Sequence, residues 1–476
     1  MHRVLDPRPI DSLTAYRAIG GGEAIRLATE VDPDTLVATV TDAGLRGRGG
    51  AGFPTGVKWR AVAANRAAGI PTTVVINAAE GEPGSFKDRT ILRTNPYRVL
   101  EGALVAAVAV GADRVVVALK ERFTTEVARV RSAIAEIDDA GWAKGIDLDI
   151  VGGPDAYLFG EETALLEVLE GRPPFPRVAP PFRHGADEIG EGGESVADVT
   201  LAGPTGATTA PPTLVDNVET LANVPLIIVD GPDAFRAVGT EASPGTLVCT
   251  VSGGGRRAGV IEVPMGTPLD DVIAEVSGAG GSPVAVLPGV SNALLPPDAL
   301  SLPLTYEDMA AAGSGLGCGA FLLFSADTDP VAIAAGVARF LAVESCGQCT
   351  PCKQDGLAIA GRLASWAGDE SASDVELELA AVNDHLATIT DGARCYLATQ
   401  HQVVVSSILS LYPEAVSRRI SSGEPVEPVT IAAIADLVEG AVVLDTDQAT
   451  KQPDWTHEPE DSGQSPADRL ESRGGT

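Results

Sequence analysis

Three closely spaced cysteines are the residues of this sequence whose type and spacing most clearly could do chemistry. Cys346, Cys349 and Cys352 are each separated by two residues, and Cys395 lies further along the chain. Such gaps let a tight loop place three thiolates on three corners of an iron–sulfur cubane, while a distant cysteine supplies the fourth. Zinc sites usually show two separated cysteine pairs, so the spacing favours a [4Fe–4S] cluster over zinc or over unliganded thiols. The two other cysteines show no comparable grouping and are expected to be small core residues: Cys249 and Cys318.

A glycine-rich segment is the second feature with chemical potential. Residues 47–52 match the G-x-G-x-x-G pattern of dinucleotide-binding loops, but they follow a helix-like stretch instead of the strand that the pattern requires. Glycines leave backbone N–H groups free to converge on phosphate, and Arg46, Arg48 and Lys58 add positive charge. We therefore expect a phosphate cradle of another kind, with a flexible loop as the alternative.

Composition excludes several classes of protein. The 476 residues include 65 acidic and 34 basic ones, giving a net charge of −31, which opposes binding to nucleic acid. No apolar run approaches the roughly 18 residues of a membrane span, and the first residues lack the pattern of a signal peptide. Six cysteines are too few for a disulfide scaffold of this size. We expect a cytoplasmic protein without direct membrane insertion.

The periodicity of apolar residues divides the chain into four parts. Residues 1–240 alternate strands, such as 72–77 and 113–120, with helices, which predicts a parallel sheet covered by helices. Residues 241–328 look like a small β-grasp domain, and 329–425, which include the cysteine cluster, are helical throughout. Residues 184–210 are expected to be an exposed insertion loop, and 426–476 an extension that is largely a disordered tail.

Five longer motifs occur in order and carry a family resemblance. They are GLRGRGGAGFPTGVKW, NAAEGEPGSFKDRTILRTNPYRVLEG, YLFGEETALLEVLEG, PTLVDNVETLANVP and ESCGQCTPCK. With them the chain resembles, from about Leu36 to Leu411, the NADH-binding flavoprotein subunit of respiratory complex I, also called the 51 kDa subunit. Flavoprotein subunits of NAD-linked hydrogenases and formate dehydrogenases are related. The resemblance implies an α/β Rossmann-like flavin domain, a β-grasp (ubiquitin-like, SLBB-like) domain and a C-terminal helical [4Fe–4S] domain.

The same resemblance assigns residues to FMN, to the cluster and to NADH as the substrate. Phe53 and Phe182 would contact the adenine end of NADH, and Glu82 and Glu162 would lie near its ribose and amide groups. Acidic residues near a ribose favour NADH over NADPH. The cluster would be held by Cys346, Cys349, Cys352 and Cys395, Glu80 and Glu162 would be catalytic, and FMN would be bound by Gly47, Arg48, Gly49, Lys58, Asn77, Glu80, Tyr157, Gly160, Glu161, Glu162 and Asn217.

Two qualifications accompany these assignments. Glu161 and Glu162 could instead mark a solvated helix start, where carboxylates complement the helix dipole. The chain also departs from the family pattern: Ala79 stands where an aspartate is expected, Ala179 where a lysine is expected, and Asp216 where an asparagine is expected. Losing one charge-assisted hydrogen bond costs roughly 1.5–3 kcal/mol, so nucleotide affinity is expected to be weakened and not abolished.

The resemblance implies an NADH dehydrogenase subunit that receives electrons first. A hydride would pass from NADH to FMN, then single electrons to the [4Fe–4S] cluster and on to a partner subunit or quinone-linked chain. The expected partner is a thioredoxin-like [2Fe–2S] subunit or another electron-accepting subunit, which could hold the chain on the cytoplasmic side of a membrane. The alternatives are a subunit that only conducts electrons without oxidising NADH, and the flavoprotein subunit of an NAD-linked formate dehydrogenase or hydrogenase.

Overall fold

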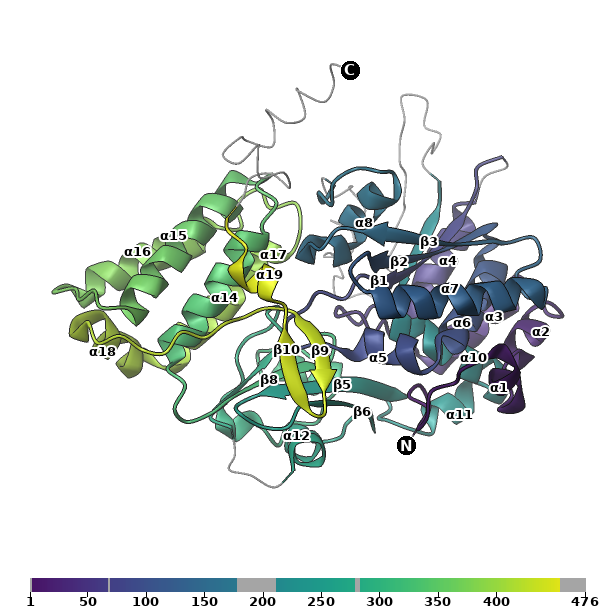
Figure 1. Cartoon of the computed structure of the whole chain (residues 1–476), viewed down its shortest axis with the longest axis horizontal. Coiled ribbons are helices and arrows are strands. Elements are labelled where there is room, and N and C mark those ends of the chain that lie inside the picture. Colours follow the sequence, from purple (N-terminus) through teal and green to yellow (C-terminus); the bar gives the residue numbers. More distant parts are fainter. Residues whose placement is uncertain (1, 67–68, 178–210, 279–282, 454–476) are drawn as a thin grey trace, which may run out of the picture.

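The computed structural model describes residues 2–66, 69–177, 211–278 and 283–453. An α/β region and a helical bundle lie at opposite ends of the molecule in Figure 1, and a smaller sheet lies below and between them. The insertion loop expected at 184–210, together with Phe182 and Ala179, falls outside these ranges. None of the helices in the described ranges is both long and apolar enough to cross a membrane.

The first region contains a four-stranded sheet with helices on both faces. Its strand order is β3-β2-β1-β4, and every neighbouring pair is parallel, which confirms the predicted parallel sheet. The elements are α1 (Leu13–Ala18), α2 (Glu23–Ala28), α3 (Pro33–Ala43), α4 (Thr55–Ala64), β1 (Thr73–Ala78), α5 (Lys87–Thr94), α6 (Pro96–Val110), β2 (Arg114–Lys120), α7 (Thr124–Asp139), β3 (Asp147–Gly153), the 3-10 helix η1 (Tyr157–Gly160), α8 (Glu162–Leu169), β4 (Thr213–Asn217), α10 (Val218–Asp230) and α11 (Pro232–Arg236).

The central strand β1 shows why both faces of this sheet are covered. Val74 and Ile76 belong to the main apolar core that includes α6, whereas Val75 belongs to a smaller cluster with Phe159 and Leu165. Alternate residues of a strand point to opposite faces, so an uninterrupted apolar strand needs cover on both sides. All three strand residues are fully buried.

Helix α3 delivers the chain to the glycine-rich segment. It begins after Asp32, which accepts a hydrogen bond from the N–H of Asp34, with Pro33 in the first turn. It ends at Gly44, whose φ of 68° is left-handed backbone that favours glycine. The glycine-rich segment therefore lies between two helices, α3 and α4, and does not follow a strand.

The second region is a mixed four-stranded sheet of order β6-β5-β8-β7. Strand β5 pairs antiparallel with β6 and parallel with β8, and β7 pairs antiparallel with β8. Helix α12 buries Leu269, Val272 and Ile273 in the core of this region. The elements are β5 (Thr246–Gly253), β6 (Gly259–Pro264), α12 (Leu269–Ser277), β7 (Ala285–Pro288), the 3-10 helix η2 (Pro297–Ala299), α13 (Tyr306–Ala311) and β8 (Ala320–Phe324).

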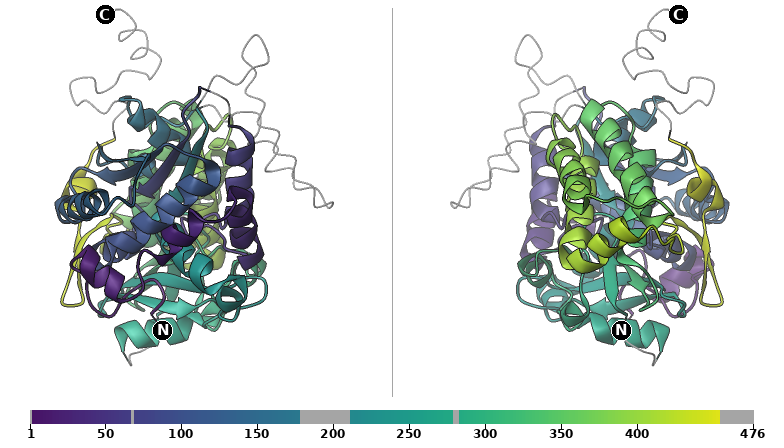
Figure 2. Two further views of the ribbon diagram at one scale, coloured as in Figure 1. Left: turned by 90° about the vertical axis from the view of Figure 1, so that its right-hand side faces the viewer. Right: turned by 90° about the vertical axis from the view of Figure 1, so that its left-hand side faces the viewer.

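The third region is helical and carries the cysteine cluster. Helix α14 starts after Asp329, which accepts a hydrogen bond from the N–H of Val331, and it packs against α15 and α17. Figure 2 shows these helices side by side as a bundle. The elements are α14 (Pro330–Glu344), α15 (Thr350–Ala367), α16 (Val375–Thr388), α17 (Leu397–Leu411) and α18 (Pro413–Ser422).

The C-terminal part corrects the expectation of a largely disordered extension from residue 426. It forms a hairpin of β9 (Ile434–Val438) and β10 (Ala441–Leu444), followed by α19 (Thr446–Thr450). The physical reason is burial in a short apolar run, which a polar overall composition conceals. The buried residues of this run are Ile431, Ala432, Ala433 and Ile434. Residues 454–476 lie outside the described ranges.

Candidate functional site: a sheet edge and a cysteine pocket

Four of the sequence motifs meet at one edge of the parallel sheet. Strand β1 ends just after Asn77, β4 ends at Asn217, and the strand register places these two residues side by side. Helix η1 follows β3, and the glycine-rich loop lies against Asn217. The strands are parallel, so their carboxyl ends share this edge, which is where open parallel sheets bind ligands.

The glycine-rich loop is closed at its base and open at its tip. The N–H of Gly47 donates to the carbonyl oxygen of Phe53 at 2.8 Å. A Cβ atom on Gly49 would lie 3.2 Å from Cβ of Asn217, whereas one on Gly50 would meet nothing within 4 Å. Gly49 thus allows the loop to approach β4 closely, and Gly50, with a φ of 142°, borders open space. Phe53 is 42% exposed beside it.

Lys58 brings a positive charge to the same edge. Its ammonium donates to the carbonyl oxygen of Val215 at 2.6 Å and to Oε2 of Glu162 at 3.1 Å. Asp216, the residue found in place of the expected asparagine, is buried and accepts a hydrogen bond from the indole N–H of Trp59 at 2.8 Å. Burial raises the pKa of Asp216 to about 6, against the opposing effects of Lys58 and Trp59.

A buried ionic cluster fixes Asn217 from behind. The ammonium of Lys87 lies 2.7 Å from Oδ1 of Asp88 and 3.0 Å from Oε2 of Glu219. The side chain of Asn217 accepts a hydrogen bond from Lys87 and donates one to Asp88. Burial alone would lower the pKa of Lys87, but the two carboxylates raise it, so the ammonium stays charged. Lys87 and Asp88 were not among the predicted residues, although both lie inside the second motif.

Asn77 connects the end of β1 to helix η1. Its side-chain amide donates to the carbonyl oxygen of Gly160 at 2.9 Å. Glu161 accepts hydrogen bonds from N–H groups in the first turn of α8, so the helix-start interpretation holds for this residue. Glu162 differs, because it pairs with Lys58 and its side chain remains 42% exposed.

Tyr157 and Glu82 form a hydrogen-bonded pair where the three regions meet. The hydroxyl of Tyr157 donates to Glu82 at 2.6 Å, and the amide of Gln400 in α17 donates to that hydroxyl at 3.1 Å. Glu82 also accepts from the N–H of Val290 at 2.7 Å and the hydroxyl of Ser291 at 3.2 Å. Burial raises the pKa of both Glu82 and Tyr157. A contact between Glu82 and NADH would compete with these three protein partners.

Two other predicted cofactor residues point into the protein. The guanidinium of Arg48 donates to the carbonyl oxygens of Pro244 and Thr246, and its residue is 1% exposed. Glu80 accepts a hydrogen bond from Arg89 at 2.9 Å. Burial would raise the pKa of Glu80, but Arg89 outweighs it and lowers that pKa. These buried partners make both side chains structural supports of the sheet edge, whereas sequence patterns predicted direct FMN contacts and, for Glu80, catalysis.

The remaining groups at the sheet edge fit a planar phosphorylated ligand such as FMN. Lys58 supplies a cation, and the glycine-rich loop supplies backbone N–H groups beside the open space at Gly50. Asn77 and Glu162 add polar side chains near the same strand ends. A pocket that orients its ligand with a few convergent polar groups is typical of cofactor sites.

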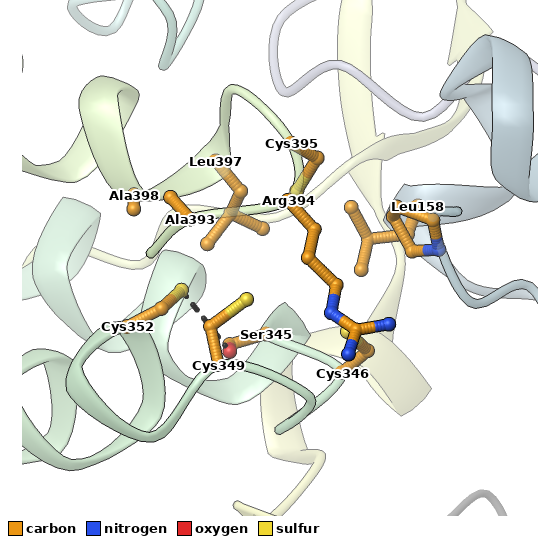
Figure 3. Close-up of a pocket in the computed structure, with 11 residues that line it drawn as sticks. Leu158, Ser345, Cys346, Cys349, Cys352, Ala393, Arg394, Cys395, Leu397 and Ala398 are labelled. Carbon is orange, nitrogen blue, oxygen red and sulfur yellow. Dashed lines mark hydrogen bonds between the residues drawn. The ribbon is translucent and has the colours of Figure 1, made fainter. Parts of the chain in front are cut away.

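The four predicted cluster ligands line one pocket in the helical region (Figure 3). Cys349 is the capping residue of α15 and Cys352 lies in its first turn, Cys395 lies just before α17, and Cys346 follows the end of α14. Two helix N-termini therefore flank the sulfurs, and such termini stabilise negative charge. The pocket is completed by Leu158, Pro176, Ser345, Ala393, Arg394, Leu397 and Ala398.

The donor set of this pocket fits a [4Fe–4S] cluster. A cubane takes one thiolate at each of its irons. Within the ranges that the structure describes, no three Cys, His, Asp or Glu side chains lie close enough together to hold a single metal ion. Burial raises the pKa of Cys346, and raises that of Cys352 to about 11. Iron ligation needs thiolates, so cluster binding must release protons.

Arg394 was not predicted and adds a positive charge to the pocket. Its guanidinium donates to Oε1 of Gln348 at 2.9 Å, and Figure 3 shows it extending across the pocket between Leu158 and Cys346. A cation beside an anionic cluster is stabilising. Its position immediately before Cys395 in the sequence was the one available signal.

Helix η1 joins the two sites. Its first residue, Tyr157, and its last, Gly160, contact groups at the sheet edge. Leu158, between them, lines the cysteine pocket. Glu344, at the end of α14, accepts a hydrogen bond from the N–H of Tyr157 at 2.9 Å and so ties η1 to the helical region. A single four-residue element therefore touches both the sheet edge and the cysteine pocket.

Comparisons with known proteins divide the chain in the same way. The Nuo51 FMN-binding domain family matches residues 40–226, and the iron–sulfur binding region of NADH-ubiquinone oxidoreductase F matches residues 332–419. The second F subunit of the NADH-quinone oxidoreductases of Rhizobium meliloti is 39% identical over 358 residues, covering 72% of this chain and 79% of that protein. The NADH-quinone oxidoreductase F subunit of Streptomyces coelicolor is 35% identical over 443 residues, covering 90% of this chain and 92% of its own.

A solved structure adds the same relationship at the level of fold. An NAD⁺-reducing [NiFe]-hydrogenase in the H₂-reduced state contains a chain that is 33% identical, with a TM-score of 0.73, over 88% of this chain and 68% of that one. These matches confirm the family predicted from the five motifs, with its FMN-binding and iron–sulfur regions. The chain therefore belongs to the family of NADH-quinone oxidoreductase F subunits.

Proposed function

We propose that this chain is the electron-input subunit of an NADH dehydrogenase, with FMN at the carboxyl edge of the parallel sheet and a [4Fe–4S] cluster in the cysteine pocket. The observation that carries this proposal is helix η1, which contributes Tyr157 and Gly160 to the first site and Leu158 to the second. When bound, FMN accepts a hydride from NADH and gives up single electrons, which the cluster carries onward.

The residues of the chain bind and orient. Lys58 and the N–H groups of the glycine-rich loop are placed to hold a phosphate, and Asn77 fixes the distance between β1 and η1. Phe53 and Glu162 are each 42% exposed at the open side, where NADH would enter. The buried cluster behind Asn217 holds this edge rigid, which limits the reorganisation needed on binding.

The test is the absorption and EPR spectrum of anaerobically prepared protein before and after adding NADH. The expected result is bound FMN that NADH bleaches, together with a cluster signal that NADH induces. A matched Cys346→Ser variant should keep the flavin response and lose the cluster signal. Protein that contains neither FMN nor iron would overturn the proposal. Protein whose cluster is reduced by dithionite, but whose flavin NADH does not bleach, would identify a subunit that only conducts electrons.

A second candidate is favoured by the structural match to the NAD⁺-reducing hydrogenase. In that case the same two sites would run electrons toward NAD⁺ in a complex with a hydrogen- or formate-oxidising subunit. Purification of the native complex, followed by analysis for nickel and molybdenum, separates the two candidates. Nickel or molybdenum in the complex would favour the second, and a quinone-reactive complex without either metal would favour the first.

Two finer features belong to the same proposal. The order β6-β5-β8-β7, with α12 between β6 and β7, is that of a β-grasp fold, so we assign the second region to this class. The electron acceptor would be a separate thioredoxin-like [2Fe–2S] subunit, and such a complex would place the chain peripherally on the cytoplasmic side of a membrane. Copurification of a second iron–sulfur protein with the native chain tests this partner.

A further inference from the structure

The C-terminal segment of residues 431–453, called the strap below, lies outside both matched family regions and contacts all three regions of the chain. In Figure 1 it lies between the helical bundle and the α/β region, in front of β5 and β8, and Figure 2 shows it along the outer edge of the molecule. On the second region, the N–H of Ala258 donates to the carbonyl oxygen of Gly440 at 2.7 Å. The strap is thus placed to affect how the regions sit together.

The first strand of the strap contacts the support of Glu80. The guanidinium of Arg89 donates through Nη1 to the carbonyl oxygen of Ala435 at 3.1 Å and through Nε to Glu80 at 2.9 Å. One turn further along α5, Arg93 pairs with Asp436 at 2.8 Å. A single guanidinium is therefore shared between the strap and a buried carboxylate beside the sheet edge.

The end of the strap contacts the support of Tyr157. The ammonium of Lys451 lies 2.9 Å from Oε1 of Glu344, whose side chain is 1% exposed, and Oε2 of the same carboxylate accepts the N–H of Tyr157. Among the described residues, Lys451 is the one cation within ion-pair distance of Glu344. A buried carboxylate deprived of its cation is strongly unfavourable, so loss of Lys451 would release the constraint on η1.

The middle of the strap is itself well held. Asp445 accepts hydrogen bonds from N–H groups at the start of α19 and pairs with Arg122, which also pairs with Asp155 in the loop before η1. Gln448 is buried and accepts the N–H of Ala433 at 2.6 Å. The strap therefore behaves as a folded clamp with three separate attachments to the sheet-edge side of the molecule.

We propose that the strap is a positioning element for the flavin site, which holds Glu80 through Arg89 and helix η1 through Glu344, so that strap docking and FMN binding are coupled. The proposal rests on the function proposed above. Neither Arg89 nor Glu344 touches the reacting atoms, and both act by fixing residues that border the cofactor. Coupling is reciprocal, so bound FMN must also stabilise the docked strap.

The experiment compares the full chain with a chain ending at residue 453 and a chain ending at residue 427. Apoprotein is titrated with FMN by fluorescence quenching, and the midpoint potential of the bound flavin is measured. We expect the chain ending at 453 to match the full chain and the strapless chain to bind FMN about tenfold or more weakly, the size of one lost charge-assisted interaction. A synthetic peptide of residues 428–453 added in trans should restore the affinity.

Point variants decide the outcome if the strapless chain does not fold. Lys451→Met should weaken FMN binding and shift the flavin potential, whereas Lys144→Met, at an exposed lysine far from the strap, should change neither. Hydrogen exchange of the strap should slow when FMN is added to the full chain. Equal FMN affinity and potential in the full chain and Lys451→Met would overturn the strap proposal alone. A full chain that binds no FMN would overturn the proposed function and, with it, this inference.

Discussion

The sheet edge and the cysteine pocket reach their chemistry in opposite ways. The pocket draws its sulfurs from two short segments that precede α15 and α17, and all four cysteines line the same space. The sheet edge draws its groups from four distant motifs, and many of their polar side chains contact one another instead. Arg48, Glu80 and Glu82 are all satisfied by protein partners. A sequence motif thus marks a site as a whole, but it does not separate ligand-binding residues from their supports.

This difference follows from the chemistry of the two donor types. A buried thiol needs no hydrogen-bond partner, so a group of four cysteines around one pocket indicates ligation. A buried charge must be paired or hydrogen-bonded, so a polar motif beside a ligand needs its own supporting residues. Arg89, Lys87 and Glu219 are such supports at the sheet edge.

The largest expected effect is loss of the cluster after a change in the pocket. Cys352→Ser should lower bound iron from about four atoms per chain to almost none, because one corner of the cubane loses its thiolate. FMN content should stay unchanged, since the sheet edge does not use Cys352. Iron and flavin analysis of the same sample measures both, with Cys249→Ala, a core thiol outside the pocket, as the control. Simultaneous loss of FMN would show that the two sites are not separable.

The next effect separates a support from a ligand-binding residue at the sheet edge. Arg48→Met should lower the free energy of unfolding by about 3 kcal/mol, because buried carbonyl oxygens lose their donor. Lys58→Met should instead weaken FMN binding about tenfold or more with a smaller change in stability. Urea unfolding and FMN titration of both variants give the comparison. The distinction drawn between these two residues fails if Arg48→Met alone weakens FMN binding.

His401 makes the helical region sensitive to acid. It is fully buried, neither ring nitrogen has a hydrogen-bond partner, and burial lowers its pKa to about 3. Because the folded-state pKa is depressed, its contribution to stability is present above pH 6.5 and is lost as the pH falls toward 3. At about 1.4 kcal/mol per pH unit, roughly 3 kcal/mol is lost by pH 4. His401→Leu should remove this loss, as measured by urea unfolding between pH 4 and 7, and an unchanged pH profile would contradict it.

Asp216 should give the sheet edge the opposite, smaller pH dependence. Its folded-state pKa is raised to about 6, so stability is lost as the pH rises from about 4 to 6. Asp216→Asn keeps an acceptor for the indole of Trp59 and should raise the free energy of unfolding at pH 7 by about 2–3 kcal/mol. The gain should vanish below pH 4, and a gain independent of pH would rule out ionisation as its cause.

Sequence patterns predicted the parallel sheet, the family and the four cluster ligands. Their success has a physical basis, because apolar alternation and cysteine spacing are local properties of the chain. The orientation of Arg48 was not predictable, since its partners Pro244 and Thr246 lie in another region. The same holds for Glu82, which meets Val290 and Ser291 only in the folded chain.

The strap was missed for a different reason. Its ordering depends on Asp445, Gln448 and Lys451, each of which acts through one specific contact in a polar stretch. Composition averages over such residues and therefore indicates disorder. Phe182 and the insertion loop stay predictions, because they lie outside the described residues.

The anchoring of the glycine-rich loop has a consequence for any attempt to divide or transplant this protein. The ring of Tyr306 packs against Gly52, the guanidinium of Arg46 lies 4.0 Å from the centroid of that ring, and Arg48 reaches the start of β5. A fragment ending near residue 240 would carry every glycine of the loop and none of these anchors. Grafting the nucleotide-binding half onto another scaffold would therefore require the β-grasp half to travel with it.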